Sequence, residues 1–220
     1  YAADVEPSLK MMRMLRDALG PQAILRIDSN MSYSLPTAIY VARELEGLNI
    51  RNWEDPVSSP EEMVKLRRHC AIPFSVHNPD LRRFVALGVP DAICTDVTVH
   101  GGIGRAWKFI AACEAMGVDF WCYSGDSGVA SAAYLHLCAA SQWIREPSQS
   151  LFRMQPTDVI AEGPFRPKNN TVRVPDGPGL GVSLDKDKLA HCHKLFVEDG
   201  PYDKFYDPDR PGVLRRLPLS

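Results

Sequence analysis

Three short apolar runs in this chain each end on a side chain that could bind a metal ion. The first run ends on Asp28, the second on Glu54, and the third on His77, which Asn78 follows. Carboxylate and amide oxygens suit hard divalent ions such as Mg²⁺, whereas imidazole is more common around transition metals. Because the runs recur about every 25 residues, as in successive strand–helix units, they predict a metal site at the mouth of a parallel barrel.

The acidic pair Glu54–Asp55 stands directly before Pro56. Proline disfavours the α conformation for the residue before it and ends a strand, so we expect Glu54 at a strand's C-terminal edge. Each acid alone has an ordinary alternative: Asp28 could cap a turn, and Glu54 and Asp55 could be solvated loop charges. Their common spacing favours the metal site. Whether His77 binds the metal stays open, because a histidine at a strand end is often only hydrogen-bonded.

The elements that must position these groups alternate along the chain. Apolar periodicity and capping residues predict helices over residues 5–19, 35–48, 61–69, 79–87, 103–116 and 129–140. Strands are predicted over residues 24–27, 72–76, 92–97 and 118–123, and in a run that ends at residues 53–54. This alternation indicates parallel βαβ units. Residues 172–182 form a turn-rich return segment, which a short helix over 189–196 and a tail rich in proline and charge follow.

Composition narrows the class of protein. The chain is 45% hydrophobic and 24% charged with a formal net charge of -2, which is typical of a globular protein with one large core. The near-neutral charge argues against a nucleic-acid partner, and no apolar run is long enough to span a membrane. The six cysteines show no metal-binding spacing and most lie in apolar runs, which favours reduced thiols and a cytoplasmic location.

Four stretches together carry a resemblance to a known family. They are Arg26–Asn30, Trp53–Pro56, Thr95–Asp96 with His100–Gly102, and Val174–Val182. In order and spacing they resemble the C-terminal barrel of the enolase superfamily, in its mandelate racemase and muconate lactonizing enzyme-like branch. The closest likeness is to the glucarate dehydratase group of acid-sugar dehydratases, and it runs from about residue 5 to about residue 195.

The resemblance implies an α/β fold, a (β/α)7β TIM-like barrel preceded by an N-terminal capping domain. By this template the chain starts after the second barrel strand, so the capping domain and the first two strands would be absent. The 220 residues are indeed fewer than the about 250 of a complete barrel. We therefore expect a fragment of a longer polypeptide, with a barrel domain over residues 1–195 and an extended C-terminal tail over residues 196–220.

The resemblance also implies a Mg²⁺ cofactor and a small carboxylate substrate, an acid sugar. Asp28 and Glu54 match the first two metal ligands, and the third would be His77 or Asn78. We prefer His77 because its offset from Pro73 matches the glucarate dehydratase-like spacing. In such sites a proton is removed next to the substrate carboxylate, and the metal stabilises the enediolate that forms. In dehydratases a general acid then protonates the departing β-hydroxyl.

The family's second catalytic element, a His–Asp dyad, is incomplete here. Asp96 matches its aspartate, but Ser124 stands at the position of its histidine. Serine alone is not a general base near neutral pH, so proton transfer would need another group. We predict catalytic roles for Asp96, Tyr123 and Ser124, and substrate contacts from Asn30, His100 and Asp126.

Three alternatives remain beside the acid-sugar dehydratase. A racemase or epimerase of the same superfamily would use a similar site, and a non-catalytic metal-binding homologue would suit the missing dyad histidine. A barrel metallohydrolase is disfavoured because no predicted strand carries His-x-His. The resemblance further implies a homo-oligomer, and it leaves the identity and stereochemistry of the acid sugar open.

Overall fold

The computed structural model describes residues 5–124, 127–150, 158–163, 165–200, 204–206 and 214–216. The chain divides into two compact units. The first comprises Tyr1–Gly125 and Ala133–Ser150, and the second comprises Asp126–Ala132 and Leu151–Ser220. Within the described ranges, no helix is both long enough and apolar enough to cross a membrane.

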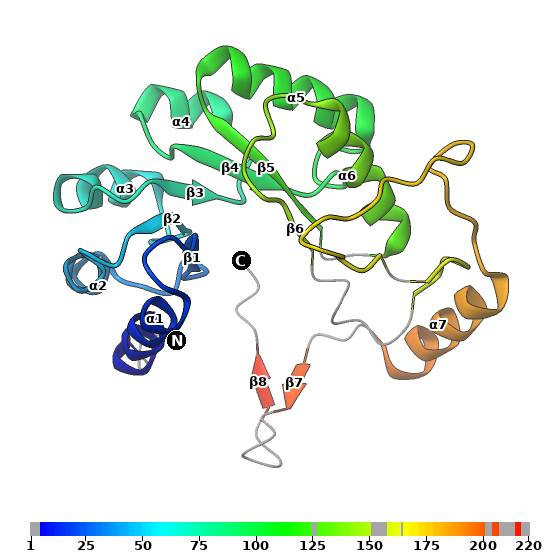
Figure 1. Ribbon diagram of the computed structural model, residues 1–220, viewed down its shortest axis with the longest axis horizontal. Coiled ribbons are helices and arrows are strands. Elements are labelled where there is room, and N and C mark those ends of the chain that lie inside the picture. The colour runs from blue at the N-terminus through cyan, green and yellow to red at the C-terminus, as the bar shows by residue number, and fades with distance from the viewer. Residues whose placement is uncertain are drawn as a thin grey trace. The chain divides into compact units, whose positions relative to one another are not determined.

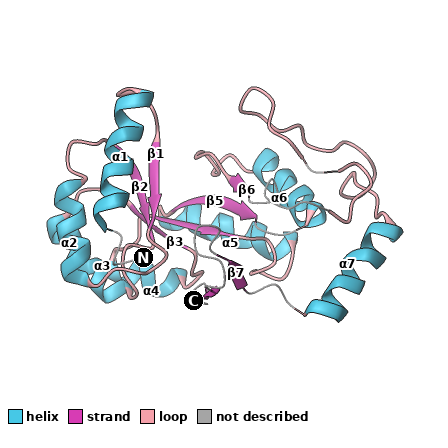
Figure 2. Ribbon diagram, turned by 90° about the horizontal axis from the view of Figure 1, so that it is seen from below, coloured by secondary structure: helices cyan, strands magenta, loops and turns pink. Residues whose placement is uncertain are grey.

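A six-stranded parallel sheet forms the centre of the first unit. Its strands pair in chain order: β1 Leu25–Asp28, β2 Ile50–Glu54, β3 Phe74–Val76, β4 Ala92–Thr95, β5 Asp119–Ser124 and β6 Gln149–Ser150. The helices between them are α1 Val5–Leu19, α2 Leu35–Glu44, α3 Pro60–Leu66 with the 3₁₀ helix η2 Arg67–His69, α4 Leu81–Leu87 and α5 Ile103–Met116. The strands curl into half of a barrel with the helices along its outer side (Figure 1), and Figure 2 shows α1 running alongside β1. The predicted α/β barrel fold is therefore confirmed.

Local sequence explains where several of these helices begin and end. The Ser34 and Ser59 hydroxyl oxygens accept hydrogen bonds from backbone N–H groups in the first turns of α2 and α3, and each helix has a proline at its first or second position. Gly88 and Gly117 end α4 and α5 in the left-handed conformation, with φ of 70° and 69°. The predicted start of α4 at residue 79 is two residues early, because Asp80 is its N-cap and accepts a hydrogen bond from the N–H group of Arg83.

The outer face of the sheet carries the main apolar core. Trp53, Phe74, Ile93 and Phe120 lie on four successive strands and are at most 2% exposed. Phe120 meets Phe109 of α5 edge to face, with ring centroids 6.0 Å apart, so this face is the one that the helices cover. Burying each such side chain stabilises the fold by roughly 1.5–3 kcal/mol. Because side chains alternate across a strand, their neighbours point to the inner face.

The inner face is partly polar. Asn52 of β2 accepts a 2.6 Å hydrogen bond from the Ser75 hydroxyl of β3. Arg26 of β1 stacks over the Trp121 ring of β5 at 4.4 Å and forms a 2.8 Å ion pair with Glu146, just before β6. Arg26 thus joins the first strand to the segment before the last one, across the inside of the curled sheet.

The described residues of the second unit contain one long helix and a few short strand pairings. The residues between α6 (Gly128–Ala140) and α7 (Lys186–Asp199) include an antiparallel bridge from Ile160 to Leu184, and the strands β7 (Lys204–Tyr206) and β8 (Leu214–Arg216) pair antiparallel. The predicted helix over residues 189–196 lies within α7.

The turn-rich segment of this unit depends on Gly181. Its φ is +71°, and a Cβ atom there would lie 2.5 Å from the Cβ atom of Pro175. The boundary between a barrel domain and a tail at residues 195 and 196 stays a prediction.

Candidate metal site at the strand ends

Three carboxylates meet where β1 and β2 end. The two strands pair in parallel with Asp28 opposite Glu54, as the common spacing of their apolar runs suggests. Ligand oxygens of Asp28, Glu54 and Asp55 all lie within 4.8 Å of one another. Oxygen donors this close together fit a hard divalent cation such as Mg²⁺.

Asn30 fixes the orientation of Asp28. The backbone N–H group of Asn30 donates to one Asp28 carboxylate oxygen and its side-chain amide donates to the other, both at 2.8 Å. Asn30 can reach both oxygens because its backbone turns into the left-handed region, with φ of 47°. Although Asp28 lies at the open edge of the sheet, partial burial and the negative charge of Glu54 raise its pKa to about 6. The carboxyl group therefore gains its proton at a higher pH than an ordinary aspartate does.

Asp55 is a member of the site that the sequence reasoning missed. It leaves the α region before Pro56, as predicted, but it does so with a φ of 44°, in the left-handed region. Its carboxylate is 5% exposed and lies 2.7 Å from the His77 imidazole. In the sequence, Asp55 stands out only as the second acid of the pair before the proline that ends the strand. The available signal was that an acid directly before proline is unusually constrained.

His77 stands between two acids. Its Nε2 lies 2.8 Å from a Glu54 oxygen and its Nδ1 lies 2.7 Å from an Asp55 oxygen. Burial alone would lower the His77 pKa, but hydrogen bonds to Asp55, Cys94 and Glu54 outweigh burial and raise it. Burial would likewise raise the Glu54 pKa, but the hydrogen bond and positive charge of His77 lower it. As an imidazolium, His77 donates one hydrogen bond to each acid, and its positive charge offsets their negative charge.

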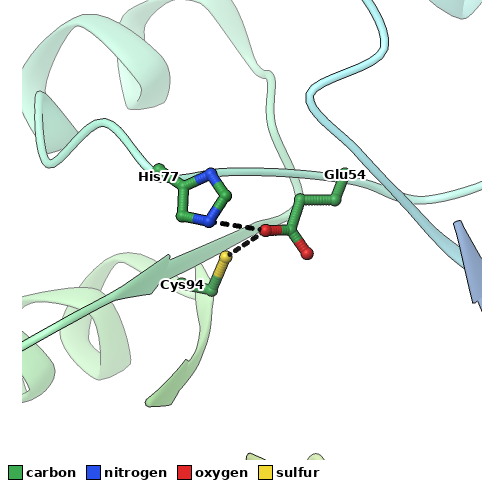
Figure 3. Close-up of side chains that lie close together, drawn as sticks. All are labelled: Glu54, His77 and Cys94. Carbon is green, nitrogen blue, oxygen red and sulfur yellow. Dashed lines mark hydrogen bonds and ion pairs between the residues drawn. The ribbon is translucent and has the colours of Figure 1, made fainter. Parts of the chain in front are cut away.

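A thiol completes this cluster. Cys94 of β4 is fully buried, and its Sγ donates a 3.1 Å hydrogen bond to the same Glu54 oxygen that His77 contacts. Figure 3 shows the three side chains pointing toward one another; Glu54 ends β2, His77 follows β3 and Cys94 lies in β4. Burial raises the pKa of Cys94 to about 12, so the group is a thiol near neutral pH. The sequence identified Cys94 as a buried thiol but not as a neighbour of Glu54.

Of the other residues predicted for the site, one faces His77 and one makes a contact outside the cluster. The ring of Tyr123 lies 5.4 Å from the His77 ring, nearly perpendicular to it, so Tyr123 faces the cluster from β5. The side-chain oxygen of Asn78 accepts a 2.9 Å hydrogen bond from the N–H group of Asp80, just before α4. Ser124 ends β5, but its side chain and the whole of Asp126 lie outside the described residues. The predicted roles of these residues stay predictions.

Asp96 and His100 make local contacts. Asp96 is buried and accepts a 2.7 Å hydrogen bond from the N–H group of Thr98. His100 lies 2.6 Å from the Thr95 hydroxyl, and its ring packs on Phe109 of α5 with centroids 4.5 Å apart. Burial lowers the His100 pKa, so its ring is neutral near pH 7. The predicted catalytic role of Asp96 and the predicted substrate contact of His100 also stay predictions.

Comparison with known proteins points to one family. Residues 2–188 match the family described as enolase C-terminal domain-like. The chain is 26% identical to a probable glucarate dehydratase from Streptomyces coelicolor, covering 88% of this chain and 46% of that protein. It is 28% identical to a D-galactarolactone cycloisomerase from Agrobacterium fabrum, covering 84% of this chain and 53% of that protein.

Solved structures agree with this result. An enolase from Pseudomonas fluorescens, crystallised with magnesium, potassium and tartrate, superposes with a TM-score of 0.83 at 25% identity. The match covers 90% of this chain and 48% of that one. The chain therefore spans about half of the length of the proteins that it matches.

Proposed function

This chain belongs to the enolase C-terminal domain-like family, and on that premise we propose that it acts in a Mg²⁺-dependent lyase that dehydrates an acid sugar. The observation that carries the proposal is the convergence of the Asp28, Glu54 and Asp55 carboxylates at the mouth of the half-barrel. A relative of similar fold is described with magnesium and the dicarboxylate tartrate. The finer assignment to acid-sugar dehydration follows the likeness to a probable glucarate dehydratase.

The residues present suit the cofactor. Asp28 and Glu54 would hold Mg²⁺ through oxygen, which is its preferred donor. When bound, the ion would stabilise the negative charge that develops on the substrate carboxylate as the neighbouring proton leaves. Asn30 keeps both Asp28 oxygens in place, because it donates a hydrogen bond to each of them. Preset ligands lose less conformational entropy when they bind.

His77 can serve in one of two protonation states. In the neutral form its Nε2 has a lone pair and could act as the third ligand, with Asn78 as the alternative. In the imidazolium form its Nε2–H group points at Glu54 and could protonate a departing hydroxyl group. Asp55 holds the opposite ring nitrogen in both cases. Tyr123 packs edge-on against the imidazole and limits its movement.

The metal assignment can be tested by measuring bound magnesium. We expect the double variant Asp28→Asn/Glu54→Gln to lose stoichiometric Mg²⁺ in equilibrium dialysis, because both lose their negative charge. A matched control is Asp119→Asn, which removes an exposed carboxylate at the opposite end of β5, where it pairs with Arg145. Full Mg²⁺ occupancy in the double variant would contradict the proposed site.

The reaction can be tested with a panel of acid sugars in deuterium oxide, using the longest polypeptide that contains this chain. A dehydratase would release water and form a keto acid. A racemase or epimerase would incorporate deuterium at the α-carbon and invert it without losing water. A non-catalytic homologue would bind Mg²⁺ and exchange no proton with any member of the panel.

We also propose a homo-oligomer and a cytoplasmic location. All six cysteines lie within the described residues and are reduced, which suits a reducing compartment.

A further inference from the structure

The cluster around Glu54 contains a second set of donors, different from the three carboxylates. One ligand atom each from Glu54, His77 and Cys94 lies within 4.8 Å of the other two. The Glu54 oxygen is 2.8 Å from the His77 Nε2 atom and 3.1 Å from the Cys94 sulfur. Glu54 and Cys94 are almost completely buried, whereas the His77 side chain is 36% exposed and leaves the site accessible on one side.

We propose that Glu54, His77 and Cys94 form a binding site for Zn²⁺ and similar thiophilic divalent ions, which compete with Mg²⁺ for Glu54. Carboxylate, imidazole and thiolate are the three common protein ligands of Zn²⁺, and three protein ligands with one open position are typical of accessible zinc sites. Mg²⁺ has little affinity for sulfur and would not use Cys94. The zinc site goes beyond the proposed lyase activity and stands without it, and only the competition for Glu54 rests on the proposed Mg²⁺ site.

The observed spacing is close to what a zinc site requires. Zn–O and Zn–N bonds of about 2.0–2.1 Å at tetrahedral angles place oxygen and nitrogen about 3.3 Å apart. With a Zn–S bond of about 2.3 Å, sulfur and oxygen lie about 3.6 Å apart. The corresponding distances here are 2.8 Å and 3.1 Å. Each pair would therefore separate by about 0.5 Å when a zinc ion enters between them.

Asp55 strengthens this assignment. Metal-bound histidines usually donate their second ring N–H group to a carboxylate, which fixes the ring and makes it a better ligand. Asp55 already accepts this bond from the His77 Nδ1 atom at 2.7 Å. The zinc-facing nitrogen is thus aimed at Glu54 and Cys94 before any ion arrives.

Proton balance predicts a pH dependence of binding. Zn²⁺ would replace the thiol proton of Cys94 and the Nε2 proton of the His77 imidazolium, so up to two protons leave for each ion bound. Both protons pass to solvent through the exposed side of His77. No oxidant or further reactant is needed.

Cobalt provides a direct probe, because Co²⁺ takes zinc sites and a thiolate ligand gives an intense near-ultraviolet charge-transfer band. We expect this band in the wild-type chain. We expect Cys94→Ser to lose the band and to bind Zn²⁺ at least about 100-fold more weakly in competition with a chelating dye. Cys113→Ser is the matched control, because Cys113 is an equally buried thiol on α5, and it should keep both properties.

Several results would overturn the proposal: Co²⁺ binding without a sulfur band, or equal Zn²⁺ affinity in the Cys94→Ser and wild-type chains. If Cys94→Ser does not fold, X-ray absorption of zinc bound to the wild-type chain tests the proposal. The proposal requires a sulfur neighbour at about 2.3 Å from the zinc ion. A coordination shell of only oxygen and nitrogen would refute the proposal. Asp28→Asn separates the two sites, because it should weaken Mg²⁺ binding and retain the cobalt band. Loss of the band in that variant would contradict a distinct donor set.

Discussion

Replacing His77 with asparagine tests whether a cation holds the strand-end acids together. The change would leave the Glu54 and Asp55 carboxylates, 4% and 5% exposed, without their positive partner. Removing one member of a buried ion pair costs about 3–5 kcal/mol. The His77 side chain is 36% exposed, so solvent screening reduces our expectation to about 2–3 kcal/mol. For a chain of this length, that corresponds to a fall in Tm of about 4–12 °C.

The effect should depend on pH with a defined sign. The raised pKa of His77 contributes stability that is fully present below the ordinary value of 6.5 and is lost as the pH rises through the folded-state value. The lowered pKa of Glu54 contributes stability that is present above the ordinary value of 4.5 and is lost as the pH falls through the folded-state value. The difference in free energy of unfolding between wild type and variant should therefore be largest between pH 4.5 and pH 6.5.

Urea denaturation followed by circular dichroism, with EDTA present, measures this difference. His69→Asn provides the control, because His69 is an exposed histidine in the same unit, and it should leave the free energy of unfolding unchanged. Added Mg²⁺ should restore part of the stability of His77→Asn, because a second cation then balances the acids. A variant within about 0.5 kcal/mol of wild type at pH 6, which is the range of an ordinary surface change, would refute the charge-balance reasoning.

Three further predictions concern other parts of the chain. Because the Asp28 pKa is raised to about 6, the Mg²⁺ affinity measured by calorimetry should fall about tenfold for each pH unit below 6. The Asp28→Asn variant should lose this pH dependence. A Mg²⁺ affinity of the wild-type chain that does not change with pH would contradict the role of Asp28. Gly181→Ala should destabilise the chain by about 2 kcal/mol or more, because the new Cβ atom would clash with Pro175 and because φ is positive at this residue. The control Gly104→Ala, whose Cβ atom meets open space, should stay within about 1 kcal/mol of wild type. Equal Tm values for the two variants would argue against the contact between Gly181 and Pro175. Arg26→Met should cost about 1–2 kcal/mol, and a double-mutant cycle with Glu146→Gln should show coupling between the two side chains; additive effects would mean that the ion pair contributes little.

Much of the fold follows from the sequence because its signals are local. Ser59 before a proline starts a helix and Gly88 ends one. The apolar runs between successive helices form the strands. Once the strands are parallel and in chain order, their carboxyl ends share one edge, and Asp28 must lie near Glu54. The barrel architecture and the neighbourhood of the two acids could therefore be predicted without coordinates.

The remaining features of the site depend on tertiary geometry. Contact between Cys94 and Glu54 requires the register of two strands that are not direct neighbours, and no pattern within β4 specifies it. The left-handed turn at Asp55 decides that its carboxylate reaches His77, whereas proline alone only excludes the α region. The packing of the His100 ring on Phe109 of α5 is likewise a tertiary contact that its position after β4 does not specify.

The positive φ angles at Asn30, Met31 and Asp55 have a consequence for attempts to increase the thermal stability of this protein. A residue with a side chain destabilises the fold by roughly 1 kcal/mol or more when its backbone adopts this conformation, and glycine would remove that strain. At Asn30 and Asp55, however, glycine would also remove the side chain that orients Asp28 or the buried partner of His77, and losing that buried partner costs more than the backbone strain. A screen for heat resistance should therefore yield glycine at Met31 sooner than at the two residues whose side chains hold the metal-site groups in place.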